Sequence, residues 1–148
     1  MGIRRRSREL AMQALFSMDM GRDDPEKTLD LFCGHFVLSK KSLPFFLQLV
    51  KGVQEVGDMI DSLLERFSDH WKLSRMPCVD RNIMRIAVYE MLYCKDIPPK
   101  VSINEAIDIG KKYGTEESGP FINGILDGIR LALEKGEIQI EEETDKNH

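Results

Sequence analysis

A cluster of cationic side chains opens the sequence, within the stretch IRRRSRELAMQALF at positions 3–16. Its four arginines are Arg4, Arg5, Arg6 and Arg8. Guanidinium groups bind phosphate through paired N–H donors, and aromatic rings stack on nucleic acid bases. Helical spacing places Glu9, Gln13 and Phe16 on the same side as Arg5, opposite an apolar stripe and toward solvent. The pattern predicts a platform for single-stranded RNA, provided that the ring is not sealed inside and the arginines are not engaged by carboxylates of the same chain.

The energy available from such a platform limits what it can do alone. Four arginines on a single-stranded backbone give a slope of log affinity against log salt of at most about −3, and one stacked base adds roughly 1–3 kcal/mol. These contributions amount to weak binding. A specific task therefore requires further contacts from the body of the protein, or a partner that shares the RNA.

Two other interpretations of the opening segment stay open. The ring of Phe16 could pack under a neighbouring helix, because bundle helices often contact partners on two sides. The chain could also be a structural helical module whose arginines are solvated and whose only partner is a protein. A protein that recognises duplex DNA is disfavoured, because no short turn places a second helix beside the arginines as in a helix-turn-helix motif.

Charge is unevenly distributed along the 148 residues, whose net charge is −4. Residues 137–148 contain five acidic side chains and one lysine, so they carry the whole net charge and leave residues 1–136 neutral. We expect one domain over 1–136 and an acidic, solvated tail over 137–148. No apolar run is long enough to span a bilayer, and the N-terminus lacks a signal-peptide pattern, which predicts a cytoplasmic protein.

The other side chains that could act in catalysis or bind a metal have no companions at the spacing that such a site requires. The cysteines, odd in number and widely spaced, predict reduced core thiols rather than disulfides or zinc ligands. They are Cys33, Cys78 and Cys94. We therefore expect no metal and no cofactor. Glu90 falls among apolar residues of a central helix, and because a buried carboxylate must be paired, we expect it to make a structural hydrogen bond to another helix end.

Helical periodicity runs through the sequence, and no segment alternates as a strand does, so we predict an all-α bundle of six or seven helices. Helices are expected from the arginine cluster to Gly21 and over 25–37, 44–67, 79–93, 103–113 and 118–135. Cys33 is expected to face the core, and the ring of Trp71 to plug it. Ser102 and Glu105 form the signature of a capping box for the helix over 103–113, which Gly114 closes.

Three stretches of the chain resemble the NusB family of bacterial transcription antitermination factors. They are RRRSRELAMQALF at 4–16, VDRNIMRIAVYEML at 79–92 and DIPPKVSINEAIDIGKKYGTEESGPFINGILDGI at 96–129. The third is the most specific, because the proline-containing turn, INEAI, the glycine-terminated helix and FINGILD occur in order. The resemblance covers the chain from Arg4 to about Lys135 and implies two small helical subdomains.

The resemblance also implies a non-enzymatic function. Proteins of this family bind boxA, a short single-stranded element in the leader RNA of ribosomal RNA operons, together with the ribosomal protein NusE. The complex keeps RNA polymerase from terminating early. Some relatives self-associate through the RNA-binding surface, and the sequence leaves a homodimer open for this chain.

Residue by residue, the resemblance implies an RNA-binding surface in two parts. Along the first helix it comprises Arg4, Arg5, Arg6, Arg8, Gln13 and Phe16. At the start of the last helix it comprises Glu117, Ser118 and Asn123, while Pro120 stands where relatives often have a basic residue. Asn123 reads a base edge in one interpretation, and in the other this face only carries the surface pair of Asp127 and Arg130. For the docking of NusE, the candidates are the charged residues Arg81, Arg85 and Glu105.

Overall fold

The computed structural model describes residues 2–21, 24–35, 39–69 and 71–140. Within these ranges the secondary structure is helical and contains no strand. The helices are α1 (Ile3–Met20), α2 (Pro25–His35), α3 (Leu43–Glu55), α4 (Gly57–Phe67), α5 (Cys78–Tyr93), α6 (Pro99–Tyr113) and α7 (Ser118–Glu134), with a 3-10 turn η1 (Leu73–Arg75). The predicted all-α class is confirmed. None of the described helices is both long and apolar enough to cross a membrane.

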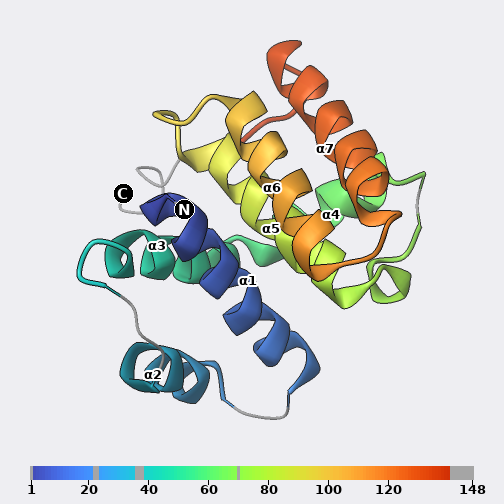
Figure 1. Cartoon of the computed structure of the whole chain (residues 1–148). Helices are drawn as coiled ribbons and strands as arrows, with labels where there is room; N and C mark the ends of the chain where they lie inside the picture. The colour runs from blue at the N-terminus through green and yellow to red at the C-terminus, as the bar shows by residue number, and fades with distance from the viewer. Residues whose placement is uncertain (1, 22–23, 36–38, 70, 141–148) are drawn as a thin grey trace.

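Helix α5 lies at the centre of the bundle (Figure 1). It packs against α1 and α3 on one side and against α4, α6 and α7 on the other. Helix α2 contacts α1. Helices α6 and α7 pack against each other, run antiparallel and are joined by a short turn (Figure 1). The two groups of helices agree with the two subdomains that the family resemblance implies, and α5 belongs to both.

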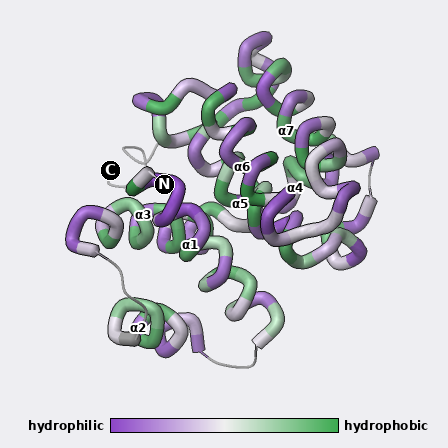
Figure 2. Tube along the Cα trace, viewed as in Figure 1, coloured by the Kyte–Doolittle hydropathy of each residue, from purple (hydrophilic) through white to green (hydrophobic). Residues whose placement is uncertain are grey.

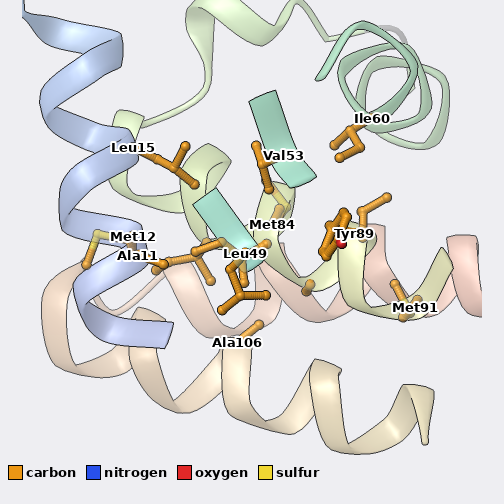
Figure 3. Packing of buried hydrophobic residues seen from close by; sticks show 14 of the residues in the cluster. Ala11, Met12, Leu15, Leu49, Val53, Ile60, Met84, Tyr89, Met91 and Ala106 are labelled. Atoms are coloured by element: carbon orange, nitrogen blue, oxygen red, sulfur yellow. The ribbon is translucent and has the colours of Figure 1, made fainter. Parts of the chain in front are cut away.

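Buried side chains from both groups form one hydrophobic cluster (Figure 3). Leu49 of α3, Met84 of α5 and Ala106 of α6 meet there, which joins the two groups through a shared interior. Hydrophobic and hydrophilic residues alternate along most of the outer helices, which therefore have a face for the core and a face for solvent (Figure 2), whereas no residue of the central helix α5 is fully exposed.

The long helix expected over 44–67 is two helices, and this prediction was wrong. The backbone leaves the helical region at Val56, with φ −113° and ψ 24°, and α4 starts at Gly57. The apolar periodicity continues across the break, which is why the sequence pattern concealed it. The break lets α3 pack on α1 while α4 turns to pack on α7.

The capping box predicted at Ser102 is also wrong. Helix α6 begins one turn earlier, at Pro99, so Ser102 lies inside the helix and is buried. Its hydroxyl donates a hydrogen bond to Glu90 Oε1 at 2.9 Å. Proline suits the first turn of a helix, because its missing N–H has no intrahelical partner there. The predicted end at Gly114 is confirmed.

The last helix ends in a Schellman motif around Gly136, whose φ is +73°. The N–H of Gly136 donates to the carbonyl of Leu133 at 3.1 Å, and the N–H of Glu137 donates to the carbonyl of Ala132 at 2.9 Å. Ile138 then packs, partly buried, against the core. The described beginning of the expected acidic tail, residues 137–140, is therefore attached to the bundle, and residues 141–148 lie outside the described ranges.

Two single-residue expectations about the core were wrong. Trp71 does not plug the core: it is 41% exposed and meets Phe121 edge to face, with ring centroids 5.2 Å apart. Cys33 is exposed on α2. Of the three cysteines, only Cys94 is buried, and Cys78 is intermediate.

Burial gives Cys94 a measurable effect on stability at high pH. Burial, reinforced by the charge of Glu90, raises the pKa of Cys94 from 9.0 to about 11. Between these values the unfolded chain has lost a thiol proton that the folded chain keeps, so the free energy of unfolding falls as pH rises. We expect wild type to lose about 2 kcal/mol relative to Cys94→Ala between pH 8.5 and 10.5, measured by urea unfolding. A constant difference between the two proteins would contradict this.

Candidate nucleic-acid interface

The arginine cluster occupies the first two turns of α1. Positive side chains are unfavourable there, because the helix dipole gives the N-terminus a partial positive charge. The first turn contains no acidic residue that would offset them. Carboxylates from distant parts of the chain supply the compensation. Arg4 pairs with Asp96 at 3.0 Å, and Arg5 pairs with Glu105 and with Asp108 of α6.

Arg8 is the most deeply placed of these arginines, with a side chain only 4% exposed. Its Nε and Nη2 each donate to a carboxylate oxygen of Glu90 at 2.8 Å, and its Nη1 donates to Glu105 at 2.9 Å. Burial alone would lower the pKa of Arg8, but its hydrogen bonds to Glu90 and the charges of both carboxylates raise it above its usual value. The expectation that Arg8 faces solvent is therefore wrong.

The same contact explains the buried carboxylate of Glu90. The predicted structural pairing is confirmed, but the partners are the guanidinium of Arg8 and the hydroxyl of Ser102 rather than a helix end. A buried, bidentate ion pair with a third hydrogen bond satisfies most of the polar atoms involved. This pairing ties α1, α5 and α6 together.

The RNA platform predicted from the sequence required arginines that are not engaged by carboxylates of the same chain, and this requirement is met only in part. Arg4, Arg5 and Arg8 are engaged by carboxylates of the same chain, so a platform of four available arginines does not exist. Arg6 differs from the other three in its pairing rather than in its exposure: its side chain is 45% exposed, against 51% for Arg4, but the carboxylate that pairs with it, that of Glu9, is 3.9 Å away. Of the four, Arg6 is the cation best placed to meet a phosphate.

A groove of about 430 Å³ runs beside the outer face of α1. Gln13 and Phe16 both line it, and both are half-buried, so the ring is neither sealed inside nor fully exposed. The remaining walls come from α2, the start of α5 and the end of α6. The lining residues are Met12, Gln13, Phe16, Ser17, Leu31, Phe32, Val79 and Tyr113.

A buried carboxylate connects this groove to the arginine cluster. Glu9 is fully buried, although helical spacing placed it on the solvent side of α1. Both of its oxygens accept hydrogen bonds from Lys112 Nζ at 3.2 Å, and Oε1 accepts one from the hydroxyl of Tyr113 at 3.1 Å. The sequence interpretation missed Lys112 and Tyr113, because their contact with α1 is formed only by the packing of α6.

The second predicted part of the interface, at the start of α7, is divided between surface and interior. Glu117 and Asn123 are exposed. Ser118 is buried, and its hydroxyl oxygen accepts a hydrogen bond from the backbone N–H of Thr115 at 2.9 Å, which places it out of reach of RNA. Burial raises the pKa of the neighbouring Asp80, and a hydrogen bond with Ser118 partly offsets this effect.

Farther along α7, the local pair predicted from the sequence forms. Arg130 Nη2 lies 2.7 Å from the carboxylate of Asp127, and Arg130 also pairs with Glu134. These carboxylates hold the guanidinium on its own helix. Asn123, one turn before Asp127, is exposed, and its contact with a base edge stays a prediction.

The charged residues predicted to dock a protein partner do not form one exposed surface. Arg81 and Arg85 share the carboxylate of Asp19, at 2.7 and 2.9 Å, and their side chains are only 12% and 14% exposed. Burial would raise the pKa of Asp19, but these arginines and Asn82 lower it below its usual value. Glu105 instead contacts the first turns of α1. Asp19 lies near the opposite end of that helix, so the three predicted residues belong to two separate ion-pair networks.

The possible metal ligands in the described part of the chain do not form a cluster. No group of three or more histidine, cysteine, aspartate or glutamate side chains is arranged there to hold a metal ion. The chemistry that the site offers is electrostatic attraction, hydrogen bonding and stacking.

Relatives of known name cover almost the whole chain. Residues 5–130 match the NusB family. The transcription antitermination protein NusB of Desulfatibacillum aliphaticivorans is 58% identical over 137 residues, which cover 93% of this chain and 96% of the relative. The NusB protein of Desulfosudis oleivorans is 54% identical over 145 residues, covering 96% and 94%.

Solved structures are similar in fold as well. NusB of T. maritima has a TM-score of 0.79 at 42% identity, covering 91% of this chain and 97% of the other. A crystal structure of antitermination factors NusB and NusE in complex with dsRNA contains a chain with a TM-score of 0.78 at 27% identity, covering 88% and 97%. The resemblance seen in the sequence is thereby confirmed: the chain belongs to the NusB family of transcription antitermination proteins, which are not enzymes.

Proposed function

We propose that this protein binds single-stranded boxA-type RNA in the leaders of ribosomal RNA operons, together with NusE, and so supports processive transcription by RNA polymerase. The observation that carries the proposal is the juxtaposition on α1 of an exposed arginine, Arg6, with Gln13 and Phe16 at a groove. A relative in this family has been crystallised as an assembly of NusB and NusE with dsRNA. The proposed task places the protein in the cytoplasm, beside RNA polymerase.

The charges on α1 also support a partner that shares the RNA. With Arg8 buried and with Arg4 and Arg5 paired, fewer cations are available to phosphates than the sequence indicates. Every phosphate that is left without a cation reduces the salt slope by about 0.7 on a single strand. A second RNA-binding protein compensates for this shortfall through the effective concentration that a complex provides. NusE docking at Arg81, Arg85 or Glu105 stays a prediction, although these side chains are more buried than expected.

Binding of labelled boxA-type RNA, measured by filter binding with and without NusE, tests the proposal. We expect Phe16→Ala to weaken binding by roughly 5- to 150-fold, the equivalent of 1–3 kcal/mol for a stacked base. Arg6→Ala is expected to lower the salt slope by about 0.7. We also expect the single strand to bind more tightly than its duplex with the complementary strand, because stacking on Phe16 requires an unpaired base.

Arg66→Ala provides the control for the loss of an arginine. Arg66 is exposed on α4, where it lies over the ring of Phe67, and no carboxylate pairs with it among the described residues. Its removal is expected to leave RNA binding unchanged. If Phe16→Ala and Arg6→Ala bind like wild type in the presence of NusE, α1 is not the RNA-binding surface.

A second candidate function is a helical module that binds only protein. The engagement of three arginines by carboxylates of the same chain favours it, because such pairs reduce the charge available to RNA. This function predicts that NusE binds with the same affinity whether or not RNA is present. Weaker RNA binding by Phe16→Ala or Arg6→Ala in the presence of NusE would exclude this alternative.

A further inference from the structure

We propose that the groove beside α1 receives one base of single-stranded RNA, with Phe16 and Tyr113 as its aromatic walls and with Arg6 and Lys112 holding the adjoining phosphate. This inference rests on the proposed function and extends it to α6, none of whose residues the sequence assigned to RNA. It identifies Lys112 and Tyr113 as contact residues and Glu9 as the residue that positions them.

The shape and lining of the groove suit a base. Its volume is about 430 Å³, and its walls combine the rings of Phe16 and Tyr113, and that of Phe32 from α2, with aliphatic, methionine and polar side chains. Bases that leave a stack are commonly held against aromatic side chains and recognised by hydrogen bonds along their edges. The amide of Gln13 lies in the same lining, and no described residue forms a hydrogen bond with it in the structure. It is therefore available to a base edge.

The charges near the groove suit a phosphate. Lys112 is 49% exposed, and with Arg6 it shares the single carboxylate of Glu9, which leaves this group of three side chains with a net charge of +1. Because Glu9 is fully buried, the two cations lie between it and solvent. A phosphate that approaches from outside meets both cations before it meets the carboxylate.

Glu9 also joins the cationic and aromatic parts of the proposed site. Its Oε1 accepts the hydrogen bond from the hydroxyl of Tyr113, and the same oxygen binds Lys112 Nζ. Lys112 Nζ lies 5.3 Å from the centre of the Tyr113 ring, so cation and ring are held as neighbours. The site is thus ordered before RNA arrives, which reduces the entropy lost on binding.

Substitutions on α6 test the inference with the full-length protein, in complex with NusE, on a boxA-type RNA that carries 2-aminopurine at one position after another. We expect Tyr113→Leu to weaken binding roughly 5- to 150-fold and to abolish the quenching of one 2-aminopurine by stacking. Tyr113→Phe keeps the ring and is expected to recover most of that loss. Lys112→Gln is expected to lower the salt slope by about 0.7, a loss of about fivefold at 0.1 M salt.

Lys111→Gln is the matched control, because it removes the same charge one residue away on the same helix. Lys111 is exposed, and its side-chain carbons lie near Gly119 rather than Glu9. We expect it to bind RNA as wild type does. Equal losses in Lys111→Gln and Lys112→Gln would overturn the inference, because they would indicate general electrostatic attraction.

Other outcomes separate this inference from the proposed function. If wild type with NusE fails to bind the RNA, the proposed function itself fails. If wild type binds but Tyr113→Leu binds equally well and still quenches 2-aminopurine, only the groove is wrong. Thermal unfolding of each variant, followed by circular dichroism, identifies any loss that is due to unfolding.

Discussion

Replacing Arg8 by methionine is expected to lower the free energy of unfolding by about 3–5 kcal/mol, the usual effect of removing one member of a buried ion pair. The substitution leaves the carboxylate of Glu90, which is 1% exposed, without its bidentate partner. Methionine keeps the volume of the aliphatic stem, so the effect reports the charge rather than a cavity. For a protein of 148 residues we expect a fall in Tm on the order of 10 °C, measured by circular dichroism.

The double variant Arg8→Met/Glu90→Met provides the control. It removes both charges together, and buried ion pairs can often be replaced by apolar side chains at little cost. We expect the double variant to be more stable than Arg8→Met alone. If the two single losses simply add, the side chains do not act as a pair. RNA-binding assays of any Arg8 variant must be corrected for this loss of stability, because Arg8 is a structural residue rather than an RNA contact.

A single methyl group at Gly52 is expected to lower the free energy of unfolding by about 3 kcal/mol, at the upper end of the range for overpacked cores. The Cβ of Gly52→Ala would fall against the ring of Tyr89, only 2.7 Å from its hydroxyl oxygen. Tyr89 is buried and stacks on Tyr93 with ring centroids 5.4 Å apart, so its ring has little room to move. Urea unfolding followed by circular dichroism measures the loss.

Gly124→Ala is the matched control, since Gly124 also lies inside a helix. A methyl group there meets no atom within 4 Å, and we expect stability to rise by about 0.5–1 kcal/mol, because alanine restricts the unfolded chain more than glycine. Equal effects of the two substitutions would show that α3 and α5 do not approach as closely as Gly52 and Tyr89 indicate.

Most of the helices were predictable, because their periodicity and their terminal residues are local features. Gly21, Gly114 and the start at Ser118 mark real ends. The break at Val56 was hidden, because the apolar pattern continues through it and only the packing partners change. Local pattern indicates which face of a helix is apolar, but it does not identify the helix that covers this face.

The candidate site was also only partly predictable from local sequence pattern, although the sequence contains one indication that Arg8 is buried. Arg8 precedes Ala11 by three residues and Leu15 by seven, so the helical period itself places Arg8 on the buried stripe. A buried cation and the buried carboxylate of Glu90 each require a partner, and the two requirements together could have suggested the pair. The burial of Glu9 was less accessible to prediction, because it depends on how α6 lies across α1.

The position of α5 in both groups of helices has a consequence for how the protein unfolds. Neither group can keep its interior dry without α5, because residues such as Met84 and Tyr89 fill space that both groups enclose. The two halves should therefore melt together, with one transition whose midpoint is the same for every spectroscopic probe. A fragment that ends before α5 is expected to remain a collapsed or unfolded chain, so the RNA-binding helix cannot be studied as an isolated half.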